Sequence, residues 1–191
     1  MRQCIFVVGS REQLAELLPL LQTAKQSGLR HSVWITAEGD DPIDAFAADA
    51  KLATSVVLPK RPAPAAAVAR YLYWLPATLY RCYHYVHGVR TWTAKSPLIV
   101  LYGDSLTTWM ASRAGRWGGA QLVHVQHTAG SRPPRAAILR KLRFAFCSVE
   151  DAEERAKRYP GCTVVGVDVN DSSQTIVDKL LRWTGGRSED S

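Results

Sequence analysis

The stretch Pro97–Arg132, PLIVLYGDSLTTWMASRAGRWGGAQLVHVQHTAGSR, decides how the rest of the chain is arranged. It contains an apolar run that ends in Gly103-Asp104, a helical pattern opened by Ser105, and a second apolar run that ends in the polar residues 124–127. This order predicts two parallel strands joined by a helix, with both carboxyl ends on one edge of a sheet. Ligands of open α/β sheets bind at that edge, so we expect the functional site there.

Strand and helix patterns alternate along the rest of the chain. Further strands are expected at 3–8, 32–36, 55–58, 144–148 and 162–167, and helices at 11–25, from 42, and at 65–92, 151–159 and 172–183. Pro76 should kink or divide the longest helix. The alternation predicts one doubly wound, mostly parallel sheet of the Rossmann-like α/β class. We expect a single domain over residues 1–184 and a flexible tail at 185–191.

Composition limits the class of protein. The chain has 191 residues, of which 47% are hydrophobic and 21% charged, as expected for one globular domain. No apolar run is long enough to cross a bilayer and no signal-peptide pattern opens the chain, so we expect a cytoplasmic protein. The four cysteines are scattered without metal-ligand spacing, which predicts reduced, mostly buried thiols and no metal site. The net charge of +7 favours an anionic partner.

The segment 65–94 is unusually aromatic, with five tyrosines and two tryptophans, and it also contains Arg70, Arg81 and Arg90. One interpretation is a long helix that packs its rings on the sheet and extends its arginines into water. The other is an interfacial helix that contacts a membrane surface or a partner subunit, because Tyr, Trp and Arg suit both surfaces. Both interpretations remain open from the sequence.

A basic run, Arg132–Arg143, contains five cations and no acid. It is either a solvated helix face or a surface that faces phosphate, and we include Arg132 among the substrate-binding candidates. No recognition helix or aromatic platform accompanies the charge, so nucleic-acid binding is not expected. Gly9-Ser10-Arg11 lacks the further glycines of a dinucleotide fingerprint, and no P-loop motif occurs, so we expect no cofactor.

Three segments together resemble the non-hydrolysing UDP-N-acetylglucosamine 2-epimerases. They are VGSR at 8–11, LYGDSLTT at 101–108 and VHVQ at 123–126, which follow the order and spacing of that family's G-T-R-P-E, G-D-x-x-[ST]-[ST] and H-V-E-A-G-[LI]-R segments. The similarity covers residues 1–167 and corresponds to the family's N-terminal Rossmann-like half. The resemblance implies half of a GT-B-type architecture, in which two Rossmann-like domains close on a nucleotide sugar. It also implies a partner, which would be a second Rossmann-like subunit or another copy in a homo-oligomer.

The resemblance also implies roles for individual residues. Ser10 and Arg11 would bind the substrate, with Arg11 at the diphosphate, and Asp104 would act on the sugar as a proton-transfer group or hydrogen-bond acceptor. Ser105 would contact the substrate or simply cap the following helix. His127, at a strand end, is either a replacement acid/base group or a structural hydrogen-bonding residue.

Three places depart from the family pattern: position 126, position 16, and the segment 133–140, which keeps the proline and arginine of the family's P-E-E-x-x-R segment and loses its acids. Gln126 stands where the family has a glutamate, and a carboxamide does not exchange protons at neutral pH. Glu16 stands where an ungapped alignment places a lysine. We therefore expect a UDP-N-acetylglucosamine 2-epimerase-like nucleotide-sugar domain for cell-surface polysaccharide synthesis, incomplete or inactive alone, with Gln126 kept as a substrate-binding candidate. The alternative is a non-catalytic or partner-dependent half of a split GT-B-type glycosyltransferase, docked on a subunit or membrane surface through residues 65–94.

Overall fold

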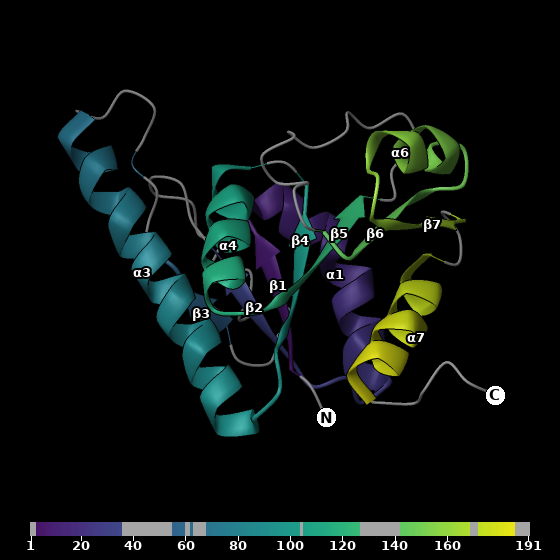
Figure 1. The fold of residues 1–191 in the computed structure, drawn as a ribbon, viewed down its shortest axis with the longest axis horizontal. Coiled ribbons are helices and arrows are strands. Elements are labelled where there is room, and N and C mark those ends of the chain that lie inside the picture. The colour runs from purple at the N-terminus through teal and green to yellow at the C-terminus, as the bar shows by residue number, and fades with distance from the viewer. Residues whose placement is uncertain are drawn as a thin grey trace.

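A computed structural model of the chain describes residues 3–35, 55–59, 62, 68–103, 105–126, 142–168 and 172–185. The strands are β1 (Cys4–Val8), β2 (His31–Ile35), β3 (Ser55–Val57), β4 (Leu98–Tyr102), β5 (Gln121–Gln126), β6 (Phe144–Ser148) and β7 (Thr163–Val167). The described helices are α1 (Arg11–Gln26), α3 (Val68–Thr93), α4 (Leu106–Trp117), α6 (Ala152–Arg158) and α7 (Ser172–Gly185) (Figure 1).

All seven strands belong to one parallel sheet with the order β3-β2-β1-β4-β5-β6-β7. The chain builds outward from β1 to β3, returns to the other side of β1 with β4, and continues outward to β7. This confirms the predicted doubly wound α/β fold. The strand order reverses between β1 and β4, and such a switch point is where open α/β sheets form their ligand crevices.

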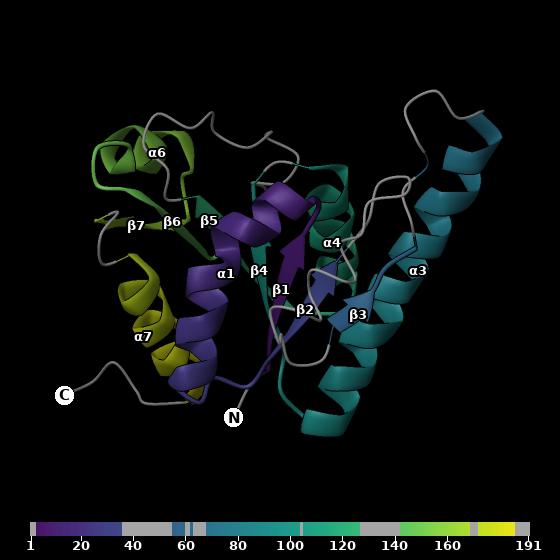
Figure 2. The ribbon, with the colours of Figure 1, turned by 180° about the vertical axis from the view of Figure 1, so that it is seen from behind.

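Helices cover both faces of the sheet. Figures 1 and 2 show α1 and α7 side by side on one face, with α3 and α4 on the other. Alternate residues of each strand supply the two cores: Phe6 and Val100 pack toward α1 and α7, whereas Ile5 and Ile99 pack toward α3 and α4. Every residue of β1 and of β4 is buried, which explains why both strands read as uninterrupted apolar runs.

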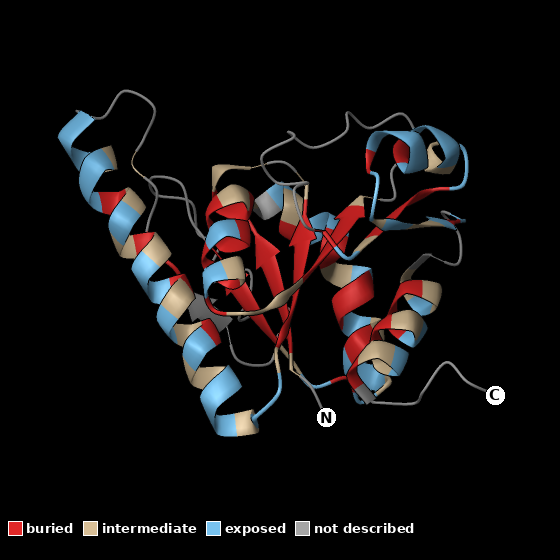
Figure 3. Cartoon of the chain, in the orientation of Figure 1, coloured by how far each residue is buried: buried red, intermediate tan, exposed pale blue. Residues whose placement is uncertain are grey.

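Pro76 does not divide α3, which runs unbroken over 26 residues. Proline leaves the carbonyl of Leu72 without its helical N–H partner, but both residues are exposed, so water can satisfy that oxygen. The side chains of α3 that become buried recur at every fourth position: Trp74, Thr78, Cys82 and Val86. Leu79, Tyr83 and Tyr85 beside this seam pack against the same core but stay partly exposed. Most of the remaining surface of α3 faces solvent (Figure 3).

The four cysteines are free thiols, as predicted, and three of them are buried. Burial raises the pKa of Cys4 and of Cys82 to about 12 and that of Cys162, which is partly buried, to about 11. The described helices include none that is long and apolar enough to cross a membrane. The helix predicted from residue 42, the basic run up to residue 141 and the tail at 186–191 lie outside the described residues.

Trp183 holds α7 against the end of the sheet, which leads to a first prediction. Its ring stacks on Phe144 at 3.7 Å between centroids and lies 5.5 Å from Phe146. Trp183 is only partly buried, so Trp183→Ala should lower the free energy of unfolding by about 2 kcal/mol, less than a fully buried aromatic ring loses. Urea unfolding measures this, with the exposed neighbour variant Arg182→Ala as control; equal losses in both variants would contradict the stacking role.

Candidate functional site

The loops that leave β1 and β4 touch at the switch point. A Cβ atom on Gly9 would overlap the hydroxyl of Ser105, so these loops approach this closely only because residue 9 has no side chain. Gly103 has a φ of +69°, and a Cβ atom there would lie 2.6 Å from Nε2 of Gln13. Gly9 is therefore required by the contact between the two loops, and Gly103 by its left-handed backbone conformation.

Gln13 connects these loops. Its Oε1 accepts a hydrogen bond of 2.9 Å from the Gly9 N–H, and its own N–H donates to Ser10 Oγ at 3.2 Å. Ser10 thus caps α1. The sequence analysis did not single out Gln13, although Ser-x-x-Gln at a helix start is the capping-box pattern that would have found it.

Ser105 caps α4, which confirms the capping alternative. Its Oγ accepts from the Thr108 N–H at 3.1 Å and lies 2.7 Å from Thr108 Oγ1, which in turn donates to the carbonyl of Tyr102. Contact of Ser10 or Ser105 with a substrate remains a prediction. Since α1 and α4 both begin at this edge, their free N–H groups and positive dipole ends suit an anion such as a diphosphate.

Tyr102 and Glu16 link β4 to α1 beneath this edge. The Tyr102 hydroxyl donates to Glu16 Oε2 at 2.8 Å. Glu16, which stands where the resemblance places a lysine, therefore has a structural partner in this chain.

His124 lies buried beneath the loop that follows β4. Its Nε2 is 3.2 Å from the carbonyl oxygen of Gly103, which can only accept, so Nε2 carries the proton. Burial lowers the pKa of His124 to about 4; the hydrogen bond to Gly103 opposes this shift and the charge of Arg155 adds to it. The imidazole is therefore neutral at pH 7 and holds the loop in place.

Gln126 is tied to a buried arginine. Arg155 Nη1 donates to Gln126 Oε1 at 3.1 Å, and Nη2 lies 3.8 Å from Asp151 Oδ2. The Arg155 side chain is only 4% exposed, and a guanidinium in such surroundings needs these acceptors. The carboxamide oxygen of Gln126 thus receives the hydrogen bond that one oxygen of a carboxylate would receive.

The predicted site residues fall into two groups. Ser10, Ser105 and Gln126 follow or end β1, β4 and β5, which are neighbours in the sheet, so they share its carboxyl edge. Arg11 opens α1 at the same edge, but its side chain is outside the described part of the structure. The remaining candidates, Asp104, His127 and Arg132, lie outside the described residues. Among those described, no three metal-ligating side chains come together.

No protein-family model and no curated protein matches this chain. Solved structures do match it. The chain is similar to the UDP-GlcNAc 2-epimerase of Neisseria meningitidis bound to UDP-GlcNAc, with a TM-score of 0.61 and 14% identity over 98% of this chain and 55% of that one. It is similar to the UDP-N-acetylglucosamine 2-epimerase of Rickettsia bellii, with a TM-score of 0.57 and 14% identity over 99% and 50%. The MurG of Acinetobacter baumannii matches with a TM-score of 0.58 and 11% identity over 78% and 41%.

These matches confirm, for the fold, the resemblance to the epimerases. The structural neighbours are UDP-N-acetylglucosamine 2-epimerases and MurG, so the fold is one found in nucleotide-sugar proteins. This chain spans about half the length of those epimerase chains, which agrees with the predicted resemblance to one half of the family's architecture.

The neutral state of His124 gives a pH prediction. Because its pKa in the folded chain is about 4 and that of an unfolded histidine about 6.5, the unfolded chain binds a proton first as pH falls. Stability should drop from pH 6.5 downward, by roughly 3 kcal/mol from this group at pH 4. Urea unfolding at pH 7 and pH 4.5 measures the loss, which His124→Asn should reduce. Equal losses in the two proteins would refute the buried, neutral assignment.

Proposed function

We propose that this chain is one half of a GT-B-type nucleotide-sugar protein and forms the sugar-facing wall of a cleft that a second Rossmann-like domain completes. The observation that carries the proposal is the close contact of the loops after β1 and β4, which brings two helix N-termini to one edge. The coverage supports it as well, since the matched epimerases are about twice as long.

The proposed ligand is a UDP-N-acetylglucosamine-type nucleotide sugar. The diphosphate would lie at the start of α1, where Ser10 already caps the helix and Arg11 adds a positive charge. The sugar would lie near Asp104, which would transfer a proton or accept a hydrogen bond. His127 and Arg132 are further candidates for proton transfer and phosphate binding, as the resemblance implies.

Epimerisation would need more than these residues supply. In the family, the reaction eliminates UDP and adds it back, which requires acid/base groups on the sugar ring. Gln126 cannot exchange a proton, so the chain alone should bind rather than epimerise its ligand. We propose that it acts in the cytoplasm, in cell-surface polysaccharide synthesis, and depends on a partner for any catalysis.

Titration of the ¹⁵N-labelled chain with UDP-N-acetylglucosamine tests this proposal. We expect saturable NMR shifts at the amides of Gly9, Gly103 and Ser105, with a Kd on the order of 1 mM because half of the cleft is missing. Asp104→Asn and Arg11→Gln should weaken binding at least about fivefold, since each removes a charged group from the edge. Arg113→Gln, an exposed arginine of α4, is the matched control and should change nothing.

Two outcomes separate the alternatives. Absence of binding and of turnover, even with a second Rossmann-like chain added, would exclude the nucleotide-sugar proposal. Saturable binding with formation of the manno epimer once a second Rossmann-like chain is added would support the epimerase-like half. Saturable binding without the manno epimer even then would support the non-catalytic, partner-dependent half of a split glycosyltransferase.

A second candidate function, docking through α3, rests on the outer face of that helix. Leu72, Tyr73 and Tyr80 are exposed by 66%, 78% and 64%, and lie on the half of α3 that extends away from the sheet (Figures 1 and 2). Arg70 and Arg81 flank them, and α3 contains no acidic residue. Exposed aromatic rings among cations suit an anionic membrane surface or an acidic partner subunit.

A double variant tests docking. Tyr73→Ser with Tyr80→Ser should reduce co-sedimentation with phosphatidylglycerol vesicles, or dissociate an oligomer seen by light scattering, at least about tenfold, because two interfacial rings are lost. Trp117→Ser, which removes a ring that is 62% exposed on α4, is the control. A monomeric chain that binds neither anionic nor zwitterionic vesicles would rule out docking through α3.

A further inference from the structure

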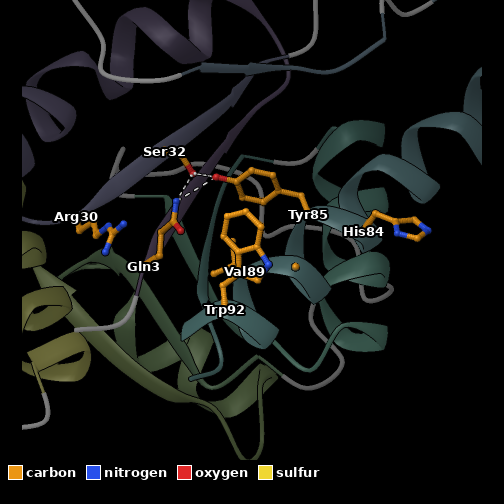
Figure 4. A pocket seen from close by; sticks show the side chains of 8 residues that line it. Gln3, Arg30, Ser32, His84, Tyr85, Val89 and Trp92 are labelled. Atoms are coloured by element: carbon orange, nitrogen blue, oxygen red, sulfur yellow. Dashed lines mark hydrogen bonds between the residues drawn. The ribbon is translucent and has the colours of Figure 1, made fainter. Parts of the chain in front are cut away.

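A pocket lies at the opposite edge of the sheet from the candidate site. Its volume is about 510 Å³, within the range of small-molecule sites. One wall comes from the amino ends of β1 and β2, and the other from the carboxyl-terminal half of α3 (Figure 4). The lining residues are Gln3, Arg30, Ser32, His84, Tyr85, Gly88, Val89 and Trp92.

Three hydrogen-bonded side chains form the polar part of this pocket. Gln3 Nε2 lies 3.1 Å from the Tyr85 hydroxyl and 3.3 Å from Ser32 Oγ, and the Tyr85 hydroxyl is 3.3 Å from Ser32 Oγ. The Tyr85 ring is fixed in turn by an edge-on contact with Trp34 at 5.4 Å between centroids. Because these groups come from three different elements and hold each other, the polar surface is formed before any ligand binds.

An exposed aromatic ring and open space complete the pocket. Trp92 is 91% exposed, which leaves a large apolar surface in water. A Cβ atom on Gly88 would meet no other atom within 4 Å, so packing does not require glycine at this position. Glycine inside a helix is less favourable than alanine by about 1 kcal/mol, and here it keeps the space beside Trp92 open.

Charge indicates what the pocket would hold. Arg30 is exposed at the rim, and the described lining residues include no acid. Figure 4 shows Arg30 and Trp92 on either side of Gln3, whereas His84 points away from the three hydrogen-bonded side chains. A cation on one side and an indole on the other match a molecule with an acidic group and a flat apolar ring.

We propose that this pocket binds a small aromatic carboxylate. The ring packs against Trp92 over Gly88, and the carboxylate pairs with Arg30. The site lies at the amino edge of the sheet, so it is independent of the proposed nucleotide-sugar site at the carboxyl edge.

Two matched probes and two matched variants test the pocket. 2-Naphthoate should shift the NMR signals of the Trp92 indole and the Gln3 side-chain amide in a saturable way. Naphthalene-2-methanol, which has the same ring system without the charge, should bind at least about fivefold more weakly, and Arg30→Gln should remove that difference. Gly88→Leu fills the open space and should weaken 2-naphthoate binding at least about tenfold, whereas Gly88→Ala should stay within about twofold of the parent chain.

The result decides the proposal in either direction. Thermal unfolding establishes that both Gly88 variants are folded before they are compared. Equal affinity of the two variants for 2-naphthoate, or shifts at Trp117 as large as those at Trp92, would overturn it. UDP-N-acetylglucosamine should leave the signals of Trp92 and Gln3 unchanged, so failure of one site is distinguishable from failure of the other.

Discussion

The loops after β1 and β4 can touch because glycine, which has no side chain, stands where they meet. Gly9 has no Cβ atom, so Ser105 can lie against it, and Gly103 leaves room for the carboxamide of Gln13. The two loops carry helices to opposite faces of the sheet, yet both helices start at one edge. A side chain at residue 9 would displace the cap of α4, and with it the polar edge that the helix starts create. The candidate site thus depends on the absence of a side chain at residue 9.

Much of this fold could be predicted because parallel strands are buried on both faces. The prediction for Phe144–Ser148 agrees with β6 at both ends, since a short segment of four apolar residues ending at a serine has few alternatives. The sequence could not show in the same way that the helix continues through Pro76. The cost of proline depends on whether the carbonyl that loses its partner is buried, and that is a property of the folded chain rather than of the local sequence.

In the candidate site, too, contacts between residues close in sequence could be predicted, and contacts between residues far apart in sequence could not. The caps at Ser10 and Ser105 follow from short-range patterns, which a single sequence displays. Arg155 acts on Gln126 from 29 residues away, and in an amphipathic helical segment an arginine reads as a surface residue. The contact shows what Gln126 does in this chain: Arg155 fixes the position of its side chain, and a carboxamide there does not titrate.

The buried thiols have a practical chemical consequence. A thiolate is the form that reacts with maleimides and oxidants, and the raised pKa values of all four cysteines leave almost none of it at neutral pH. A single new cysteine on an exposed position would therefore be modified far faster than the native ones. Spectroscopic labels can be attached selectively to this protein without first removing any of its own cysteines.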